Sequence, residues 1–503
     1  MNILLLLLSL ILPLLILIIY HKQKRQQKSL HPPGPPGLPF IGNLHQFDTS
    51  APHIYLWRLS KKYGPLMSMK LGSVPVLVVS SPKMAKEVLK THDLVFSSRP
   101  RVLGQDKLSY NRSDIAFAPY SESWRELRKI CVLHLLSNKQ VQSFRPIREK
   151  EVFRMIRSLS VRSSSGQATN LSATMLSLTS TLICRVAFGK MFDEEGLDKR
   201  RFDELMIESQ AMQGGFFFSD YLPSFGWVDR LSGMIGRLDK ICKELDEFYQ
   251  ELIDEHLDPS WPKSVNLLDL FIQLKAENSC SIDLTWDHVK AILMINKCCY
   301  TKTCLRGKLF YSSPSELDIF IAGTDTGAAT IIWTMTALMK HPTSMKKLQN
   351  EIRELIGEKA QETLRLYPPA PLLLPRETLE KCNLNGYTIP PKTLVYVNAW
   401  AIARDPEYWE NPNEFQPERF LNTNVDIIGQ DFQVIPFGAG EGCPGISMGL
   451  ATVEIALANL VYSFDWDLPS GMKKEDIDTE VLPGLTMHKK IPLSLVPRNY
   501  KYP

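Results

Sequence analysis

The chain has 503 residues, of which 44% are hydrophobic and 22% are charged, and its formal net charge is +4. This is the composition of an ordinary globular protein with an ample core, and it excludes a disordered or fibrous chain. The weak positive charge and the lack of a dense basic patch with interleaved aromatic residues argue against nucleic-acid binding. Nine cysteines, an odd number scattered along the sequence, favour a reducing compartment over a disulfide framework.

Residues 1–20 form an almost continuous run of Leu and Ile. The run is long enough to cross a bilayer, and no small-residue cleavage site follows it. The basic residues over 21–28 place the downstream chain on the cytosolic side. We therefore predict a single-pass transmembrane signal anchor over 1–20, with a cleaved signal peptide as the alternative. A basic and Pro-rich hinge is expected over 21–48, as a stiff extended arm that leads to a body beginning at residue 49.

The first part of the body is predicted to combine helices with two short strands. Helices are expected at Pro52–Tyr63 and Pro82–Thr91, with Pro at a permitted first-turn position in the second. Strands are expected at Leu66–Leu71 and Val74–Val79, on either side of a Gly-Ser turn. The Ser-, Arg- and Pro-rich stretch over 97–122 is predicted to be a loop.

A further helix opens at Ser123 and carries Trp124 and Arg128 four residues apart, so that both side chains project from one face. Taken alone, this spacing is equally typical of an ordinary amphipathic helix. The pattern over about 141–278 is mostly helical and is broken by a Gly-rich, aromatic segment over 214–226. That segment suits a flexible cover over a pocket, a membrane contact or a plain buried loop.

A long, mostly apolar and therefore buried helix is predicted from Asp318 to Leu338. Its middle places Asp325 beside Thr324 and Thr326, and an acid in a buried helix is costly unless it has a use or a partner. Two interpretations stay open. Asp325 either faces a cofactor and delivers protons, or it is paired elsewhere while a Thr bonds back to the preceding turn.

The next stretch carries an acid and a base three residues apart. Glu362 and Arg365 lie on a helix that Pro368 stops, and most pairs of this kind are simply solvated. A strand is expected over 394–398, and Pro417–Phe420 is expected in a loop.

The glycine-rich segment over 436–445 brings Cys443 to a turn just ahead of a helix. The apolar residues from Ile446 to Leu460 recur at steps of three and four, which indicates one buried helical face. The free N–H groups and the positive dipole end at a helix start favour a thiolate, and a thiolate held by its backbone is a good axial ligand for iron. A buried free cysteine beside a helix cap is the alternative.

These motifs, in this order, resemble those of the microsomal plant cytochrome P-450 family over nearly the whole chain. The resemblance implies a mainly α fold with small β-sheets, in which a large helical bundle and a minor antiparallel sheet region form a single heme-thiolate catalytic domain over 49–503. It implies heme b (iron protoporphyrin IX) as cofactor and Cys443 as the axial ligand of its iron, with the aromatic Phe437 packed nearby. It implies Asp325 and Thr326 as the acid and the alcohol that pass protons to dioxygen. The remaining implied roles are propionate contacts for Trp124, Arg128 and Arg376, and a structural network for Glu362, Arg365 and Arg419.

The resemblance implies a heme-thiolate monooxygenase in the endoplasmic reticulum membrane, with a cytosolic catalytic domain. It would insert one oxygen atom of O2 into a small, largely apolar substrate similar to a plant secondary metabolite, with electrons from an NADPH-dependent flavoprotein reductase. By analogy, the pocket walls are expected at Arg101–Tyr120, near Phe216, on the helix at Ala322 and at Leu372–Leu374. A heme-thiolate isomerase or dehydratase, which needs no O2, is an alternative against which Asp325 and Thr326 argue.

Three stretches depart from the family's pattern. The heme loop is one residue short and carries Glu441 where an Arg is expected, so a propionate loses a cation. Residues 295–317 form an insertion rich in Cys and Lys, which we interpret as a surface loop rather than an iron–sulfur fragment. A short helix and loop are missing between Ile356 and Gln361. A catalytically inactive, heme-poor membrane protein from a faulty gene model or splice form is therefore a further alternative.

Overall fold

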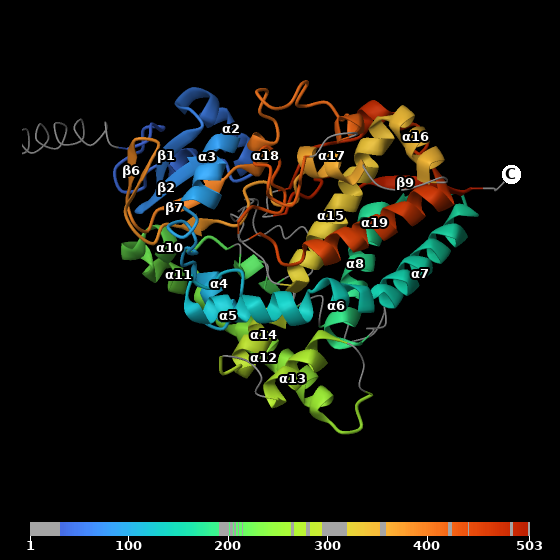
Figure 1. The fold of residues 1–503 in the computed structure, drawn as a ribbon, viewed down its shortest axis with the longest axis horizontal. Helices are drawn as coiled ribbons and strands as arrows, with labels where there is room; N and C mark the ends of the chain where they lie inside the picture. Colours follow the sequence, from blue (N-terminus) through green and yellow to red (C-terminus); the bar gives the residue numbers. More distant parts are fainter. Residues whose placement is uncertain are drawn as a thin grey trace, which may run out of the picture.

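The structure of the protein is a computed structural model. It describes residues 31–190, 201, 205, 208, 209, 211–213, 215–262, 266–277, 282–293, 319–352, 359–420, 425–440, 442–482 and 486–500. The predicted anchor over 1–20, the insertion over 295–317 and Glu441 lie outside these residues. The molecule has a sheet-containing part and a larger helical part, which lie side by side (Figure 1). This confirms the mainly helical fold with small sheets that the sequence predicts.

The sheet-containing part is built on four strands in the order β1-β2-β7-β4. The strands are β1 (Leu66–Leu71), β2 (Val74–Val79), β7 (Leu394–Val397) and β4 (Arg376–Glu377). β1 and β2 form the predicted antiparallel hairpin, whereas β7 joins β2 in parallel from a distant part of the chain. Helices α2 (Pro52–Tyr63), α3 (Pro82–Lys86) and α18 (Ala399–Ile402) lie beside this sheet (Figure 1).

The Pro-rich segment after the basic residues is hydrogen-bonded to strand β1. The backbone N–H of Ser68 in β1 donates to the carbonyl of Pro33 at 2.8 Å, and its hydroxyl donates to Pro32 at 2.6 Å. Prolines lack an N–H but keep a carbonyl, so a Pro-rich segment can still accept from the edge of a sheet. The part of the predicted hinge near residues 32–43 therefore covers the outer edge of β1.

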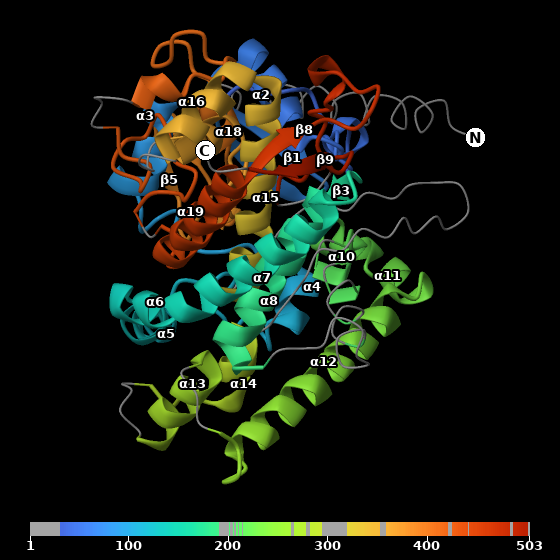
Figure 2. The same ribbon diagram turned by 90° about the vertical axis from the view of Figure 1, so that its right-hand side faces the viewer.

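The helical part is organised around α15 (Ile319–Lys340), which packs against α8 (Leu171–Phe188), α16 (Pro342–Ile352), α17 (Lys359–Leu366) and α19 (Ile446–Ser463) (Figure 2). Buried hydroxyls on α15 bond back to the preceding turn, as for Thr330 to the carbonyl of Thr326 at 2.8 Å. This satisfies polar groups inside a helix that is buried on most sides. Among the described residues, the other α-helices are α4 (Leu103–Leu108), α5 (Glu122–Ile130), α6 (Asn138–Ser143), α7 (Arg145–Ser163), α10 (Phe218–Tyr221), α11 (Trp227–Leu231), α12 (Met234–Leu257), α13 (Leu267–Ala276) and α14 (Trp286–Leu293).

Short elements complete the chain. The small sheets pair β9 (Ser494–Asn499) with β3 (Thr169–Asn170) and β8 (Phe464–Asp467), and β5 (Cys382–Leu384) with β6 (Tyr387–Ile389). Two π-helical turns, η2 (Glu87–Thr91) and η3 (Cys131–Leu135), extend α3 and α5. Single 3-10 turns occur at η1 (Leu44–Gln46), η4 (Pro223–Phe225), η5 (Pro417–Phe420) and η6 (Lys474–Asp476).

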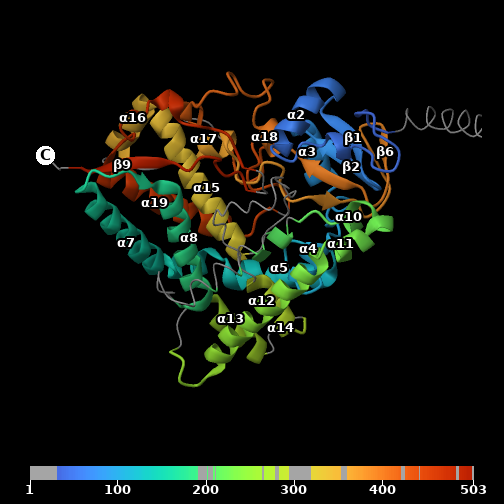
Figure 3. The ribbon, with the colours of Figure 1, turned by 180° about the vertical axis from the view of Figure 1, so that it is seen from behind.

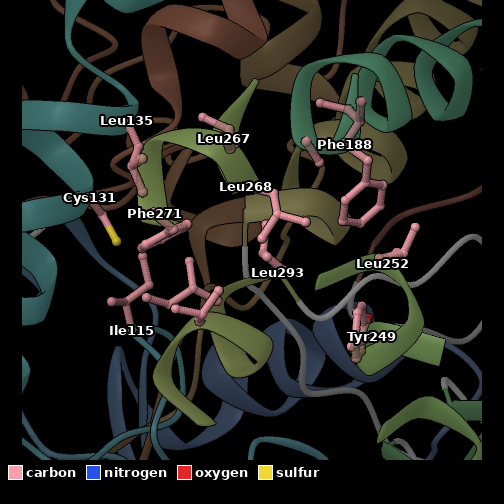
Figure 4. Close-up of a cluster of buried hydrophobic side chains, with 14 of the residues drawn as sticks. Ile115, Cys131, Leu135, Phe188, Tyr249, Leu252, Leu267, Leu268, Phe271 and Leu293 are labelled. Atoms are coloured by element: carbon pink, nitrogen blue, oxygen red, sulfur yellow. The ribbon is translucent and has the colours of Figure 1, made fainter. Parts of the chain in front are cut away.

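A large apolar cluster joins α5, α8 and the helices α12 to α14, which form the lower lobe seen from behind in Figure 3. In Figure 4, Ile115, Leu135 and Phe271 point into this cluster, and the buried thiol of Cys131 lies beside them. Among the described residues, α8 and α19 are long and apolar enough to cross a membrane. This is weak evidence for a span, because core helices pass the same test.

Most of the sequence-based boundaries agree with the structure, but some need correction. Pro417–Phe420, expected in a loop, forms the 3-10 turn η5, and the short strands β3 to β6 were not predicted. The stretch over 97–122 is not wholly a loop, because it contains α4, which buries Leu108 in the large apolar cluster. Strands β8 and β9 were not predicted either. They pair with each other and β9 also pairs with β3, so long-range contacts stabilise strands whose local pattern is weak.

Candidate functional site

The loop over 436–445 turns sharply ahead of α19. Gly438 and Gly440 have φ of +77° and +67°, and a Cβ at Gly440 would come within 2.5 Å of the carbonyl of Leu89. Only glycine tolerates both conditions without strain. The backbone N–H of Cys443 donates to the carbonyl of Phe437 at 3.1 Å, which closes the loop. The sequence therefore fixes the backbone of Cys443 at the start of a helix, as expected.

A cavity enclosing about 1550 Å³, part of it open to solvent, lies between this loop and α15. Cys443 and Phe437 form one wall, and Thr326 and Gly327 of α15 are part of the lining. Most of the remaining surface is apolar, with side chains from the segment before α5, from α8 and from the segment before β4. These include Ile115, Ala116, Ile183, Val186, Leu373 and Leu374.

The pocket walls expected by analogy are brought together only in part. Residues from the 101–120 stretch and from Leu372–Leu374 line the cavity with Cys443. Phe216 instead lines a second cavity, beside β2 and β7, with Arg101, Asp220 and Tyr396. Phe216 stacks on Tyr221 with a ring separation of 5.3 Å, which holds it on that side.

Arg128 lies next to the cysteine loop. Its guanidinium lines the cavity and donates to the carbonyl of Gly442, the residue before Cys443. Trp124 does not line the cavity, and its indole N–H donates to the carbonyl of Ile115 at 3.0 Å. The guanidinium of Arg128 lies 5.6 Å from the centre of the Trp124 ring. This cation–π contact helps to hold the arginine side chain in position.

Two further arginines line the same cavity. Arg376 forms an ion pair with Asp93 at 3.5 Å and donates to the carbonyl of Phe96 at 3.2 Å. Arg99 donates to the carbonyl of Pro375 at 3.1 Å and was not predicted. Its position beside β4 results from long-range folding, and an arginine in a polar loop carries no local signal. Three guanidinium groups around an apolar cavity suit an anionic, flat ligand.

The electrostatics of Cys443 differ from the simple expectation of a helix-start thiolate. Burial raises the pKa of the Cys443 thiol above its ordinary value, while the backbone N–H of Gly445 and the charge of Arg128 oppose the shift. The protein alone therefore favours the thiol. A bound metal ion deprotonates a coordinating thiol outright. An iron ion at Cys443 would therefore stabilise the thiolate that the protein alone disfavours.

Glu362, Arg365 and Arg419 form a buried network on and next to α17, the helix whose Leu364 lines the cavity. Arg365 donates from Nε and Nη2 to the two carboxylate oxygens of Glu362 at 2.7 and 2.8 Å, and both side chains are 0% exposed. Arg419 adds a third hydrogen bond to Glu362 at 3.2 Å. The other Arg365 donors reach the carbonyls of Ala403, Pro412 and Glu414. The network thereby joins α17 to the segment that precedes the cysteine loop.

The structure places Asp325 in a buried ion pair. Its Oδ2 lies 2.9 Å from Nε2 of His488, near the end of the chain, and Asp325 is not among the residues that line the cavity. This is the arrangement of the second interpretation above, in which Asp325 is paired elsewhere. Thr326, the next residue, does line the cavity. Sequence reasoning missed His488, because no local pattern links it to α15.

The donor set fits an iron porphyrin, which is flat and apolar and carries two carboxylates: a thiol on one wall, guanidinium groups at the rim and an apolar interior. The class that the fold and this site define is a heme-thiolate oxidoreductase.

Comparison with known proteins narrows the class. A family model described as cytochrome P450 matches residues 32–296 and 315–494. The chain is 48% identical over 498 residues to 6,7,8-trihydroxycoumarin synthase and 49% identical over 500 residues to 5-OH-xanthotoxin synthase, both from Pastinaca sativa, with 94% of each chain covered. A zebra fish cytochrome P450 solved with progesterone shares the fold, with a TM-score of 0.70, 24% identity and coverage of 89% and 99% of the two chains.

The chain belongs to the cytochrome P450 family, in its plant branch, and its cofactor is heme b. It is an oxidoreductase that incorporates oxygen from O2.

Proposed function

We propose that this protein hydroxylates a small aromatic lactone of the coumarin class. Two relatives that match it along 94% of its length are named for hydroxylated coumarins. The single observation in the structure that carries the proposal is that Cys443 and Thr326 line one largely apolar cavity. A planar apolar substrate fits such a cavity. Hydroxylation also requires that the group that activates O2 lies in the same cavity as the substrate.

Side chains that line the cavity have the chemistry needed to bind heme and to deliver a proton. Cys443 would hold the heme iron, while Arg99, Arg128 and Arg376 would pair with the propionates. Phe437 would pack beside the sulfur and restrict water. Bound heme with a thiolate ligand supplies O2 activation, because the thiolate favours O–O cleavage. The hydroxyl of Thr326, at the cavity wall, would orient a proton toward the reacting oxygen.

The electron supply and the location complete the proposal. Electrons would come from NADPH through a membrane-bound flavoprotein reductase. Residues 1–20 would anchor the protein in the endoplasmic reticulum membrane, with a single catalytic domain over 49–503 in the cytosol. Residues 295–317 would form an inserted surface loop, since the family model matches the chain on either side of 297–314.

The first experiment asks whether the chain holds heme. The full-length protein is expressed in membranes, and its reduced, CO-bound difference spectrum is recorded beside that of Cys443→Ser. We expect a thiolate-type Soret band in the wild type and its loss in the variant. A wild type without the band would support the heme-poor alternative.

The second experiment tests the substrate class. Membranes with the reductase receive NADPH and either xanthotoxin or simple coumarins, and products are identified by mass spectrometry. A gain of one oxygen atom that depends on NADPH supports the proposal. Turnover without NADPH would favour the isomerase or dehydratase alternative, and a spectrally intact protein that oxidises no coumarin would overturn the substrate assignment alone.

A further inference from the structure

The ion pair between Asp325 and His488 joins two distant parts of the molecule. Asp325 lies in α15, and His488 lies next to Lys489, which forms an isolated antiparallel bridge with Val481. Nε2 of His488 and Oδ2 of Asp325 are 2.9 Å apart, and the two residues are only 8% and 3% exposed. A pair this deeply buried is not a surface contact formed by chance.

The backbone next to His488 is tied on two sides. The N–H of Met487 donates to the carbonyl of Pro369 at 2.8 Å, and the carbonyl of Met487 accepts from Nε1 of Trp333 at 2.6 Å. Trp333 belongs to α15, the helix of Asp325, and Pro369 lines the cavity. These bonds fix the position of the imidazole relative to both the carboxylate and the cavity wall.

The pair leaves part of the carboxylate without a bond. Oδ1 of Asp325 is buried and accepts no hydrogen bond from any residue that the structure describes. A buried carboxylate is costly without a cation, and His488 supplies one. Burial lowers the pKa of His488, but the charge and hydrogen bond of Asp325 outweigh it and make the net shift upward. The neighbouring carboxylate of Asp325 therefore favours the protonated form of the imidazole.

We propose that His488 is a positioning residue for proton delivery, which holds the Asp325 carboxylate in one orientation directly beside Thr326. Oδ2 is bound to the imidazole, and Oδ1 remains available to take up and release protons. Monooxygenation consumes substrate R–H, O2, two electrons and two protons, and gives R–OH and water. The two protons must enter an apolar cavity, and an oriented acid next to a cavity hydroxyl serves that need.

The inference rests on the monooxygenase activity and not on the coumarin substrate. The test uses full-length protein in membranes with reductase, NADPH and any substrate that the wild type oxidises. His488→Phe removes the charge and the hydrogen bond but keeps a flat ring, and His488→Gln keeps a donor without the charge. Lys490→Gln is the matched control, because Lys490 lies two residues further along the chain, is exposed and pairs with Glu480 at the surface.

We expect His488→Phe to lower the product formed per NADPH about tenfold, with the lost electrons appearing as hydrogen peroxide. The CO difference band and the spectral shift on substrate binding should stay within about twofold of wild type, because the pair lies outside the cavity lining. Iodosylbenzene transfers an oxygen atom without needing a proton, so turnover driven by it should also stay within about twofold. His488→Gln should lie between, and Lys490→Gln should match the wild type.

An unchanged yield of product per NADPH in His488→Phe would overturn the proposal. So would an equal loss in NADPH-driven and iodosylbenzene-driven turnover, since that indicates a structural role. If His488→Phe retains no heme, His488→Gln carries the same comparison. A readout without turnover is the shift in thermal unfolding of Asp325→Asn, His488→Phe and the double variant: strongly non-additive shifts support the pair, and additive shifts refute it. If the wild type forms product from another substrate with NADPH but oxidises no coumarin, the substrate proposal is refuted and the role of His488 can still be tested.

Discussion

The guanidinium of Arg128 donates a hydrogen bond to the carbonyl of Gly442, the residue directly before Cys443. This bond connects α5 to the cysteine loop, so one arginine both lines the cavity and restrains the backbone of the proposed iron ligand. The family resemblance implies an arginine in this loop at the position where this chain has Glu441. Among the described residues, Arg128 supplies a positive charge next to this loop.

Replacing Arg128 should therefore weaken heme retention. Arg128→Gln keeps a donor but removes the charge. We expect the CO difference band per milligram of protein to fall about tenfold or more, in line with about 1.5–3 kcal/mol for a charged hydrogen bond. Arg125→Gln is the control, because Arg125 is exposed on the same helix. A full band in Arg128→Gln would show that the arginine does not hold the cofactor.

Breaking the buried network should cost stability. Glu362→Gln leaves the Arg365 guanidinium buried without its counter-charge, and we expect a loss of about 3–5 kcal/mol in the free energy of unfolding. Lys347→Gln removes an exposed ion pair with Glu418 and should cost less than about 1 kcal/mol. Urea unfolding, followed by tryptophan fluorescence, measures both. Equal effects of the two changes would contradict the distinction between buried and exposed pairs.

Gly440 should not tolerate a side chain. Gly440→Ala forces a residue with a Cβ into φ of +67°, which costs about 1–2 kcal/mol, and brings the Cβ to 2.5 Å from the carbonyl of Leu89. The cysteine loop must then shift, and we expect a reduced CO difference band. Gly236→Ala in α12, where a Cβ meets nothing within 4 Å, should stabilise the protein slightly. An intact band in Gly440→Ala would mean that the loop has an alternative path.

The buried His53 should make stability depend on pH. Burial, together with nearby Arg404, lowers the pKa of His53 to about 3, from 6.5 in the unfolded chain. The folded state thus favours neutral imidazole, so this contribution is complete above pH 6.5 and is lost as the pH falls toward 3. The loss is up to about 1.4 kcal/mol per pH unit. His53→Leu should flatten the decline in unfolding free energy below pH 6.5, and an unchanged slope would contradict a buried neutral histidine.

The insertion should be dispensable. The family model matches residues on either side of 297–314 but not these residues themselves. Deleting 297–314 should leave the CO difference band and its position unchanged, and should not lower the yield of folded protein. Loss of the band on deletion would show that the inserted residues are part of the fold.

The sequence by itself determined the elements that local pattern encodes. The apolar alternation around a Gly-Ser turn defined β1 and β2, and the glycines around Cys443 defined a turn ahead of α19. Helix periodicity and capping act over a few residues, so such features can be read without tertiary information. The same reading placed Glu362 and Arg365 on one helix but could not say that they are buried.

Only the tertiary structure decided which distant side chains meet. Asp325 could equally have faced the cofactor or paired elsewhere, and its partner His488 lies 163 residues further along the chain. Arg99 likewise reaches the cavity only because its segment lies against the residues before β4. Contacts of this kind depend on packing between whole elements, and no periodic signal in the sequence records them.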